Sequence, residues 1–280
     1  MDQAPKMLAC ALCSLSLRAM RVMVLDLSNY SLLTIFLVSL AIILGACEVG
    51  RALGMHAKVP SGDAVSTLAG AVLGLLALMI AFTFAMALSR YEARRDAVVS
   101  EANAIGTTAL RARLLPAAES KDVLRLLKEY VQIRLDIERS DSGADIDAAI
   151  ARSNELQEAV WQHARAMAAN DSRMVPTGLF IQTLNEMIDS QGNRLAAIRA
   201  RIPNFVLTSL YVMAILASAL AGYANGLETR LRLPIYIVGM LISAMIFLIQ
   251  DLDRPGAGFI ESSQQPMTDL ANSIAAYVGP

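Results

Sequence analysis

Cysteine and histidine are the residues of this chain that could bind a metal ion or carry redox chemistry. The chain has three cysteines and two histidines. Two of the cysteines, Cys10 and Cys13, form a single Cys-x-x-Cys motif. A structural zinc site needs four ligands, and neither a second cysteine pair nor a nearby histidine completes the set, since His56 and His163 are far apart. We therefore expect no metal site on these residues and no cofactor.

Catalytic motifs are also missing from the sequence. It contains no phosphate-binding glycine loop, no Gly-x-Ser-x-Gly elbow, and no histidine and carboxylate at helical spacing within an apolar stretch. The apolar stretches hold ionisable residues only at their ends, which argues against a proton-coupled transporter. The sequence predicts a protein that is not an enzyme.

One row of residues could instead form part of an ion pathway. Gly74, Leu78 and Phe82 recur every four residues, and Thr83 adds a hydroxyl beside them. Such an apolar row could line a narrow pore neck that excludes water, if several copies met at an axis. Gly70 and Gly74 also form a small-xxx-small pair, which lets helices approach closely. Spacing alone favours the alternative, in which Leu78 and Phe82 face lipid or a neighbouring helix.

A single long helix over Ala64–Pro116 is expected to carry this row. The residues up to Leu88 are apolar, and about 20 apolar residues span the hydrocarbon core of a bilayer. From Ser89 the sequence becomes charged without a turn signal, and Pro116 is the first residue that forbids further helix. A helix of roughly 50 residues would be about 75 Å long, so it would leave the membrane and continue into an aqueous domain.

The composition indicates further membrane spans. The chain of 280 residues is 55% hydrophobic and 18% charged, with a mean hydropathy of +0.48, whereas soluble proteins carry about a quarter charged residues. The spans predicted beside the long helix are Leu32–Cys47, Phe205–Tyr223 and Leu233–Ile249. A polar link, Glu48–Asp63, follows the first of them. The predicted fold is therefore all-α, with four transmembrane helices as two hairpins.

A helical aqueous insert is expected between the two hairpins. It carries 16 basic and 16 acidic side chains over Arg90–Arg201, a balance typical of a solvated surface. Apolar residues at spacings of three and four predict three amphipathic helices there, and a short helix is expected over Pro266–Val278. The predicted organisation is a lead-in (1–27), hairpin 1 (28–88), the helical domain (89–202), hairpin 2 (203–250) and a tail (251–280).

Basic residues near the ends of the spans predict the orientation in the membrane. Most of them fall on the side of the insert and of both termini, which we therefore place in the cytoplasm. The formal net charge is −1, and nucleic-acid binding usually needs a basic face, so no nucleic-acid partner is expected.

Three stretches of the chain resemble known families. The segment Leu73–Phe82, followed by Ser89-Arg-Tyr-Glu-Ala-Arg-Arg95, resembles the second-span signature of bacterial bestrophin-type channels. The resemblance is closer to a bacterial four-span membrane family of unknown function that is described as bestrophin-like. The motifs that carry it are Ala81–Tyr91, Glu101-Ala-Asn-Ala-Ile-Gly106 and Asp251-Leu-Asp-Arg-Pro255.

The resemblance to bestrophin channels implies a pentamer in the bacterial cytoplasmic membrane. In those channels the second span lines an apolar neck, so Gly74, Leu78 and Phe82 would be neck positions, and Thr83 with Arg90, Arg94 and Arg95 would lie near the pore. In the channel signature an arginine and an asparagine follow the phenylalanine. Here Thr83 and Phe84 replace them, so the motif does not indicate which ion would pass.

The tail motif has two interpretations. The bestrophin calcium clasp is an acidic cluster after the last span, and Asp251 and Asp253 lie in the corresponding region. Calcium takes about six to eight oxygen ligands, however, and two carboxylates fall short of that. We therefore favour a structural role, in which they pair with Arg94, Arg95 or Arg254, or cap the turn at Pro255 and Gly256.

Two functions remain as hypotheses. The first is an oligomeric ion channel whose partners are the lipid bilayer, further copies of the chain and small inorganic ions. The alternative is a non-conducting membrane anchor that presents the helical insert to a cytoplasmic partner, as a scaffold or signalling module.

Overall fold

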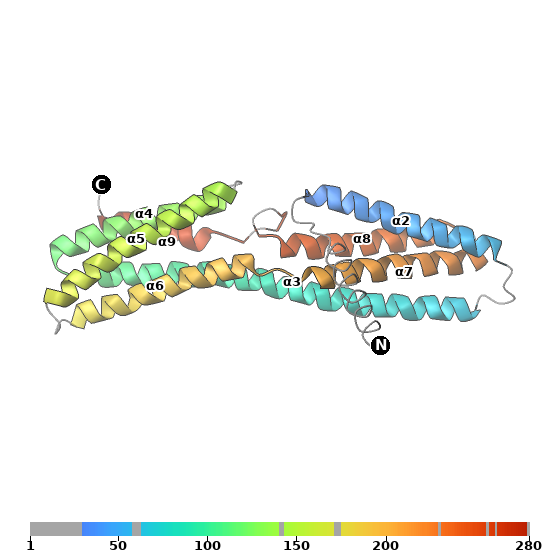
Figure 1. Cartoon of the computed structure of the whole chain (residues 1–280), viewed down its shortest axis with the longest axis horizontal. Helices are drawn as coiled ribbons and strands as arrows, with labels where there is room; N and C mark the ends of the chain where they lie inside the picture. The colour runs from blue at the N-terminus through green and yellow to red at the C-terminus, as the bar shows by residue number, and fades with distance from the viewer. Residues whose placement is uncertain are drawn as a thin grey trace, which may run out of the picture. The chain divides into compact units, whose positions relative to one another are not determined.

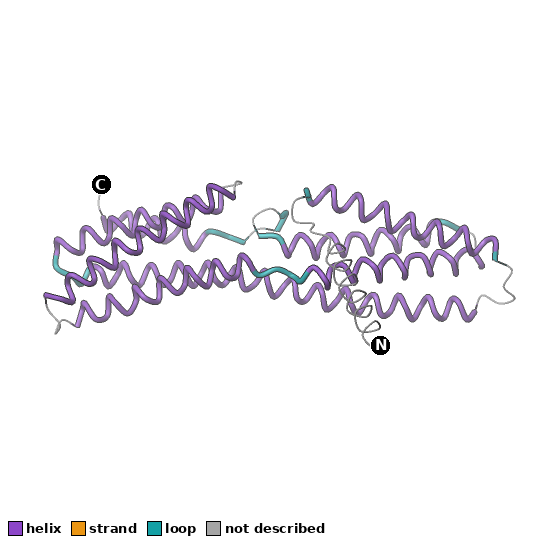
Figure 2. Tube along the Cα trace, in the orientation of Figure 1, coloured by secondary structure: helices purple, strands orange, loops and turns teal. Residues whose placement is uncertain are grey.

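The computed structural model describes residues 30–57, 63–139, 143–170, 175–228, 231–255, 258–260 and 262–278. The predicted lead-in over 1–27, with Cys10 and Cys13, lies outside these ranges, as does Gly256. All the regular elements in the described ranges are α-helices (Figure 2). They are α2 (Leu32–His56), α3 (Asp63–Ala112), α4 (Ala117–Arg139), α5 (Gly143–Asn170), α6 (Val175–Arg199), α7 (Asn204–Glu228), α8 (Leu233–Asp253) and α9 (Gln265–Val278).

The chain divides into two compact units. The membrane unit comprises Met1–Ser89 and Arg201–Phe259, and the helical unit comprises Arg90–Ala200 and Ile260–Pro280. Residues 260–280, which the sequence analysis assigned to a separate tail, therefore belong to the helical unit. Helix α3 is the element that both units share (Figure 1).

The four predicted membrane spans are confirmed as helices. The segments long and apolar enough to cross a bilayer are Leu32–His56, Asp63–Ala112, Val175–Glu228, which includes α7, and Leu233–Asp253. The first helix does not end at Cys47, as the sequence suggested, but continues through Glu48 to His56. Glu48 and Arg51 form an ion pair of 2.8 Å one turn apart, so these charges stabilise the helix rather than ending it. The expected polar link is correspondingly shorter.

The predicted long helix is also confirmed. Helix α3 has 50 residues and ends at Ala112, four residues before Pro116. A tight turn follows, in which the Leu115 amide donates to the Ala112 carbonyl at 3.2 Å. Helix α4 then begins directly after the proline. The proline ring has no N–H to donate and clashes with the preceding helical turn, so α3 cannot continue through it.

Helices α2 and α7 approach each other closely in the membrane unit. A Cβ atom on Gly50 would lie 1.9 Å from the Ala219 carbonyl oxygen, and one on Gly222 would lie 2.1 Å from the Cys47 carbonyl oxygen. Gly54 and Gly226, one turn further along each helix, are equally confined. Each helix therefore presents a Gly-xxx-Gly pair to the other, which allows backbone contact without side chains between them.

The helical unit has its own apolar core. Its buried members come from the C-terminal half of α3 and from α4, α5, α6 and α9. Helix α9 contributes Met267, Leu270 and Ile274, and its predicted bounds agree with those observed to within one residue. A Cβ on Gly106 would lie 3.3 Å from Leu270, so α9 packs closely against α3.

Candidate functional site

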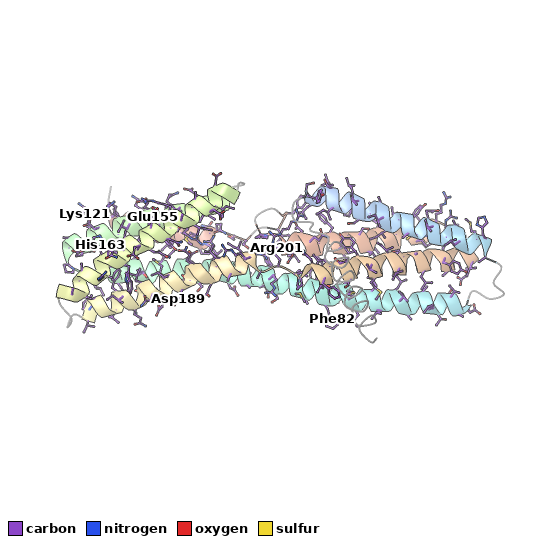
Figure 3. All side chains as sticks on the ribbon, viewed as in Figure 1. Phe82, Lys121, Glu155, His163, Asp189 and Arg201 are labelled. Atoms are coloured by element: carbon purple, nitrogen blue, oxygen red, sulfur yellow. The ribbon has the colours of Figure 1, made fainter. Side chains whose placement is uncertain are left out.

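The Gly74–Leu78–Phe82 row lies on a face of α3 that the described residues of its own unit leave open. Leu78 is 52% exposed and Phe82 is 67% exposed; Figure 3 labels Phe82 on α3. No described atom lies within 4 Å of the position that a Cβ would take on Gly70 or Gly74. The buried residues of this part of α3 are Leu76, Ile80, Thr83 and Ala87. At about 100° per residue they lie on the opposite side of the helix.

The structure adds two observations about this segment. Thr83 does not lie beside the row, because it is buried on the packed face and its hydroxyl donates to the Met79 carbonyl at 2.7 Å. The Gly70–Gly74 pair does not bring two helices together within the described part of one chain. The close contact is made instead by the glycines of α2 and α7, whose four-residue spacing was visible in the sequence.

The three arginines expected near the pore have different environments. Arg95 is exposed, Arg90 is partly exposed, and Arg94 is buried in the helical unit. Because α3 is continuous, Arg95 lies 13 residues beyond Phe82 on the same helix, or about 20 Å along its axis. Arg90 and Arg95 can therefore present charge to solvent, and Arg94 cannot.

The two aspartates of the tail motif bind backbone amides. An Asp251 carboxylate oxygen accepts from the Phe259 amide at 2.7 Å, and an Asp253 carboxylate oxygen accepts from the Ile202 amide at 2.8 Å. Both side chains are buried. Asp251 thus holds the turn that follows Pro255, which agrees with the capping interpretation. Among the described residues, no group of three or more histidine, cysteine or acidic side chains could hold a metal ion.

Arg254 completes the tail motif at the C-terminal end of α8. Its guanidinium donates through Nη1 to the Tyr30 carbonyl at 2.7 Å, which joins the end of α8 to the residues before α2. Burial lowers the pKa of Arg254, and the positive charge of Arg201 lowers it further. The motif Asp251-Leu-Asp-Arg-Pro255 therefore forms hydrogen bonds with three other segments of the membrane unit, at Tyr30, Ile202 and Phe259.

The helical unit contains a buried polar cluster that the sequence did not predict. Glu101 is fully buried; its carboxylate accepts from Arg134 Nε at 2.8 Å and from Arg194 Nη1 at 2.6 Å. Tyr130 donates to the Gln191 amide oxygen at 2.9 Å, and Gln157 donates to the Tyr130 hydroxyl at 3.2 Å. The cluster thereby links α3, α4, α5 and α6. The only signal in the sequence was the position of Glu101 at the start of the Glu101–Gly106 motif.

A second missed cluster lies at the other end of the membrane unit from Arg254. Arg51 donates to the Glu48 carboxylate from Nε and Nη2, and the Tyr236 hydroxyl donates to it at 2.5 Å. Arg232 lies 3.7 Å from the same carboxylate. These contacts join α2 to the start of α8. They satisfy the charges locally and give no indication of catalysis.

Comparison with known proteins agrees with this architecture. The chain matches the family model of the bestrophin-like domain over residues 33–267. No curated protein matches it significantly.

Solved structures of similar fold include bacterial bestrophin homologues. Two structures of a homologue from Klebsiella pneumoniae are each 16% identical to this chain. The first match covers 88% of this chain and 96% of the homologue, with a TM-score of 0.60. The other covers 86% and 95%, with a TM-score of 0.61. A further membrane protein, 15% identical, covers 87% and 97% with a TM-score of 0.63. The family match spans most of the chain and the four-span helical fold agrees with it, so this chain belongs to the bestrophin-like family.

Proposed function

We propose that the protein is an oligomeric ion channel, with five subunits around an apolar neck formed by α3. Gly74, Leu78 and Phe82 line this neck, and small inorganic ions pass through it. The protein sits in the cytoplasmic membrane of a bacterium, with both termini and the helical unit in the cytoplasm. The partly exposed Arg90 and the exposed Arg95 lie beyond the cytoplasmic end of the neck.

The observation that carries this proposal is the open face of α3. A helix surface that only faces lipid gains nothing from glycine, which weakens the helix interior by about 1 kcal/mol relative to alanine. Gly70 and Gly74 nevertheless lie in open space, in line with Leu78 and Phe82. Small residues on an exposed membrane face allow another backbone to approach. The row is therefore better suited to an axis shared by several copies than to lipid contact.

Ion flux from liposomes tests the neck. Purified protein should release small ions, and Leu78→Ala combined with Phe82→Ala should raise the flux several-fold, because a wider and less apolar constriction wets more easily. Leu241→Ala is the matched control, since Leu241 is equally exposed but lies on α8. It should leave the flux unchanged. Absence of flux from a well-folded oligomer would rule out conduction.

The mass of the protein in detergent separates the channel from the alternative function. A pentamer is expected for a channel. A monomer or dimer without conductance would instead favour a membrane anchor that binds a cytoplasmic protein through residues 117 to 200 of its helical unit. Crosslinking through that unit would then identify the partner.

A further inference from the structure

Arg134, in the buried cluster of the helical unit, has one nitrogen atom that its carboxylate partner does not use. The side chain is 1% exposed, and its Nε and Nη2 atoms donate to the Glu101 carboxylate at 2.8 and 3.3 Å. Contact through this edge of the planar guanidinium group leaves Nη1 on the side turned away from Glu101. Nη1 is buried and has no hydrogen-bond partner among the residues that the structure describes. Its two N–H groups therefore lack an acceptor from this part of the chain.

Ser153 of α5 supplies a second buried donor of the same kind. The residue is fully buried, and its hydroxyl forms no hydrogen bond within the described ranges. Buried polar groups in folded proteins are nearly always hydrogen-bonded, to the protein itself or to a bound molecule. Two such groups on neighbouring helices therefore point to a ligand that both of them contact.

The packing of α4 against α5 brings the two donors to the same level. Only residues 140–142 separate the two helices in the chain, and the helices run antiparallel beside each other (Figure 1). Gln157 of α5 donates to the Tyr130 hydroxyl of α4 at 3.2 Å, which fixes their register. Arg134 follows Tyr130 by one helical turn, and Ser153 precedes the glutamine by one turn. In an antiparallel pair these two steps run in the same direction, so both donors belong to one level of the interface.

The chemistry of these groups favours an anion as the ligand. Arginine can only donate, and a serine hydroxyl can donate as well. The carboxylate of Glu101, which pairs with Arg134, also accepts from Arg194 at 2.6 Å, so Arg134 shares its counter-charge with a second guanidinium group. A water molecule would need acceptors for its own two hydrogens, whereas a monatomic anion needs donors alone. A charged donor such as Arg134 also offsets the cost of burying an anion.

We propose that Arg134 Nη1 and the Ser153 hydroxyl bind a small monatomic anion, chloride, between α4 and α5. The bound ion links the two helices at the Glu101 cluster and stabilises the folded helical unit, to an extent that rises with the chloride concentration. The site belongs to the helical unit, whereas Leu78 and Phe82 belong to the membrane unit. It is therefore independent of whether the protein conducts ions.

Thermal unfolding of the purified full-length protein in detergent tests this site. Sodium chloride should raise the unfolding temperature relative to sodium gluconate at equal ionic strength, because gluconate is too large for a site between two packed helices. Ser153→Ala should raise the chloride concentration needed for a given increase about fivefold, as expected for one lost hydrogen bond. In gluconate the variant should be at least as stable as wild type, because it removes an unpaired buried hydroxyl. A merely structural role of Ser153 would instead lower the stability equally in both salts.

Ser190→Ala is the matched control. Ser190 is a buried serine of the same unit, but its hydroxyl already donates to the Met187 carbonyl at 2.7 Å. The control should leave the dependence on chloride unchanged. An equal weakening of that dependence in both variants would contradict the assignment of Ser153 to the site.

Bromide in place of chloride locates the ion directly. Crystals of the wild-type protein grown in sodium bromide should give an anomalous scattering peak beside Arg134 and Ser153. This measurement does not depend on the folding of any variant. Density at that position without an anomalous signal would identify a buried water molecule and overturn the proposal, as would equal unfolding temperatures in chloride and gluconate.

Discussion

At the scale of single residues, Glu101 has the greatest structural consequence in the helical unit. Its carboxylate accepts hydrogen bonds from Arg134 of α4 and Arg194 of α6, and all three side chains are buried. Arg194 also donates to Gln264, just before α9, at 3.1 Å. A buried ion pair gains little over apolar packing, but removing one partner leaves an uncompensated charge and is costly. Glu101 therefore specifies how these helices pack around α3.

Replacing Glu101 tests this role. Glu101→Gln keeps the shape of the side chain but removes the charge that compensates two buried arginines, so it should destabilise the helical unit by about 3–5 kcal/mol. Amide hydrogen exchange of α4 and α6 in the full-length protein measures the effect. The control is Glu155→Gln, whose ion pair with Arg152 is exposed and should contribute little. Unchanged protection in Glu101→Gln would contradict the assigned role.

The Tyr130 hydroxyl in the same cluster predicts a dependence of stability on alkaline pH. Burial raises the pKa of Tyr130 well above its usual value, and the negative charge of Glu101 raises it further. The unfolded chain then loses its phenolic proton near pH 10 while the folded chain keeps it. The free energy of unfolding is therefore unaffected below that pH and falls above it, by up to about 1.4 kcal/mol per pH unit.

Comparison with a variant isolates this contribution. Tyr130→Phe should reduce the decline of stability between pH 10 and 11, although the variant is less stable at neutral pH because Gln191 and Gln157 lose a hydrogen-bond partner. Denaturant unfolding followed by circular dichroism at each pH measures both effects. Parallel declines in the two proteins would show that Tyr130 does not cause the dependence.

At the scale of helices, the contact between α2 and α7 depends on glycine more than on apolar area. Four glycines, two on each helix, leave no room for a Cβ atom, and the nearest obstructing atoms are all backbone. Backbone cannot move aside as the end of a long side chain can. Lipid offers no hydrophobic drive to helix association, so close packing of this kind must hold the two helices together.

A pair of alanine substitutions on one helix tests the contact. Gly50→Ala should separate α2 from α7 and lower the stability of the membrane unit by at least the 1–3 kcal/mol typical of overpacking. Gly45→Ala is the matched control, because no described atom lies within 4 Å of its Cβ position. The control should be neutral or slightly stabilising, since alanine favours helix. Thermal unfolding in detergent, monitored by size-exclusion chromatography, distinguishes the two variants. Equal unfolding temperatures for Gly50→Ala and Gly45→Ala would contradict the close contact.

At the scale of the whole molecule, α3 connects the proposed neck with the helical unit. The same helix carries Leu78 and Phe82 on an open face and Glu101 in a buried cluster. No contact between the two units is needed for this connection, because an unbroken helix joins them. We expect assembly of several copies to direct the open face toward the shared axis and to leave the Glu101 cluster unchanged.

Chemical modification tests the neck in the assembled protein. Phe82→Cys should make ion flux through liposomes sensitive to a positively charged thiol reagent, because the added group would lie in the narrowest part of the pathway. Leu241→Cys is the control on α8, and Cys47 is buried and should react slowly. Equal sensitivity of the two variants would exclude Phe82 from the ion pathway.

The sequence by itself determined the features that depend on residues close together in the chain. Apolar runs predicted the four spans, the three- and four-residue periods predicted α4, α5 and α6, and Pro116 predicted the end of the long helix. Each of these signals is local, since hydropathy, helical period and a missing N–H act within a few turns. The predicted end of the first span at Cys47 is wrong, because Glu48 continues the helix and its partner Arg51 stabilises it.

Only the tertiary structure decided which faces are buried and which charges meet. The sequence contained three Gly-xxx-Gly pairs in or beside apolar runs, and only the fold shows that those of α2 and α7 pack together while Gly70 and Gly74 stay open. Likewise, only the fold shows that Thr83 is buried and that Glu101 pairs with arginines from two other helices. The physical reason is that such contacts join residues far apart in the chain. Their energies depend on the relative position of whole helices, which no local pattern records.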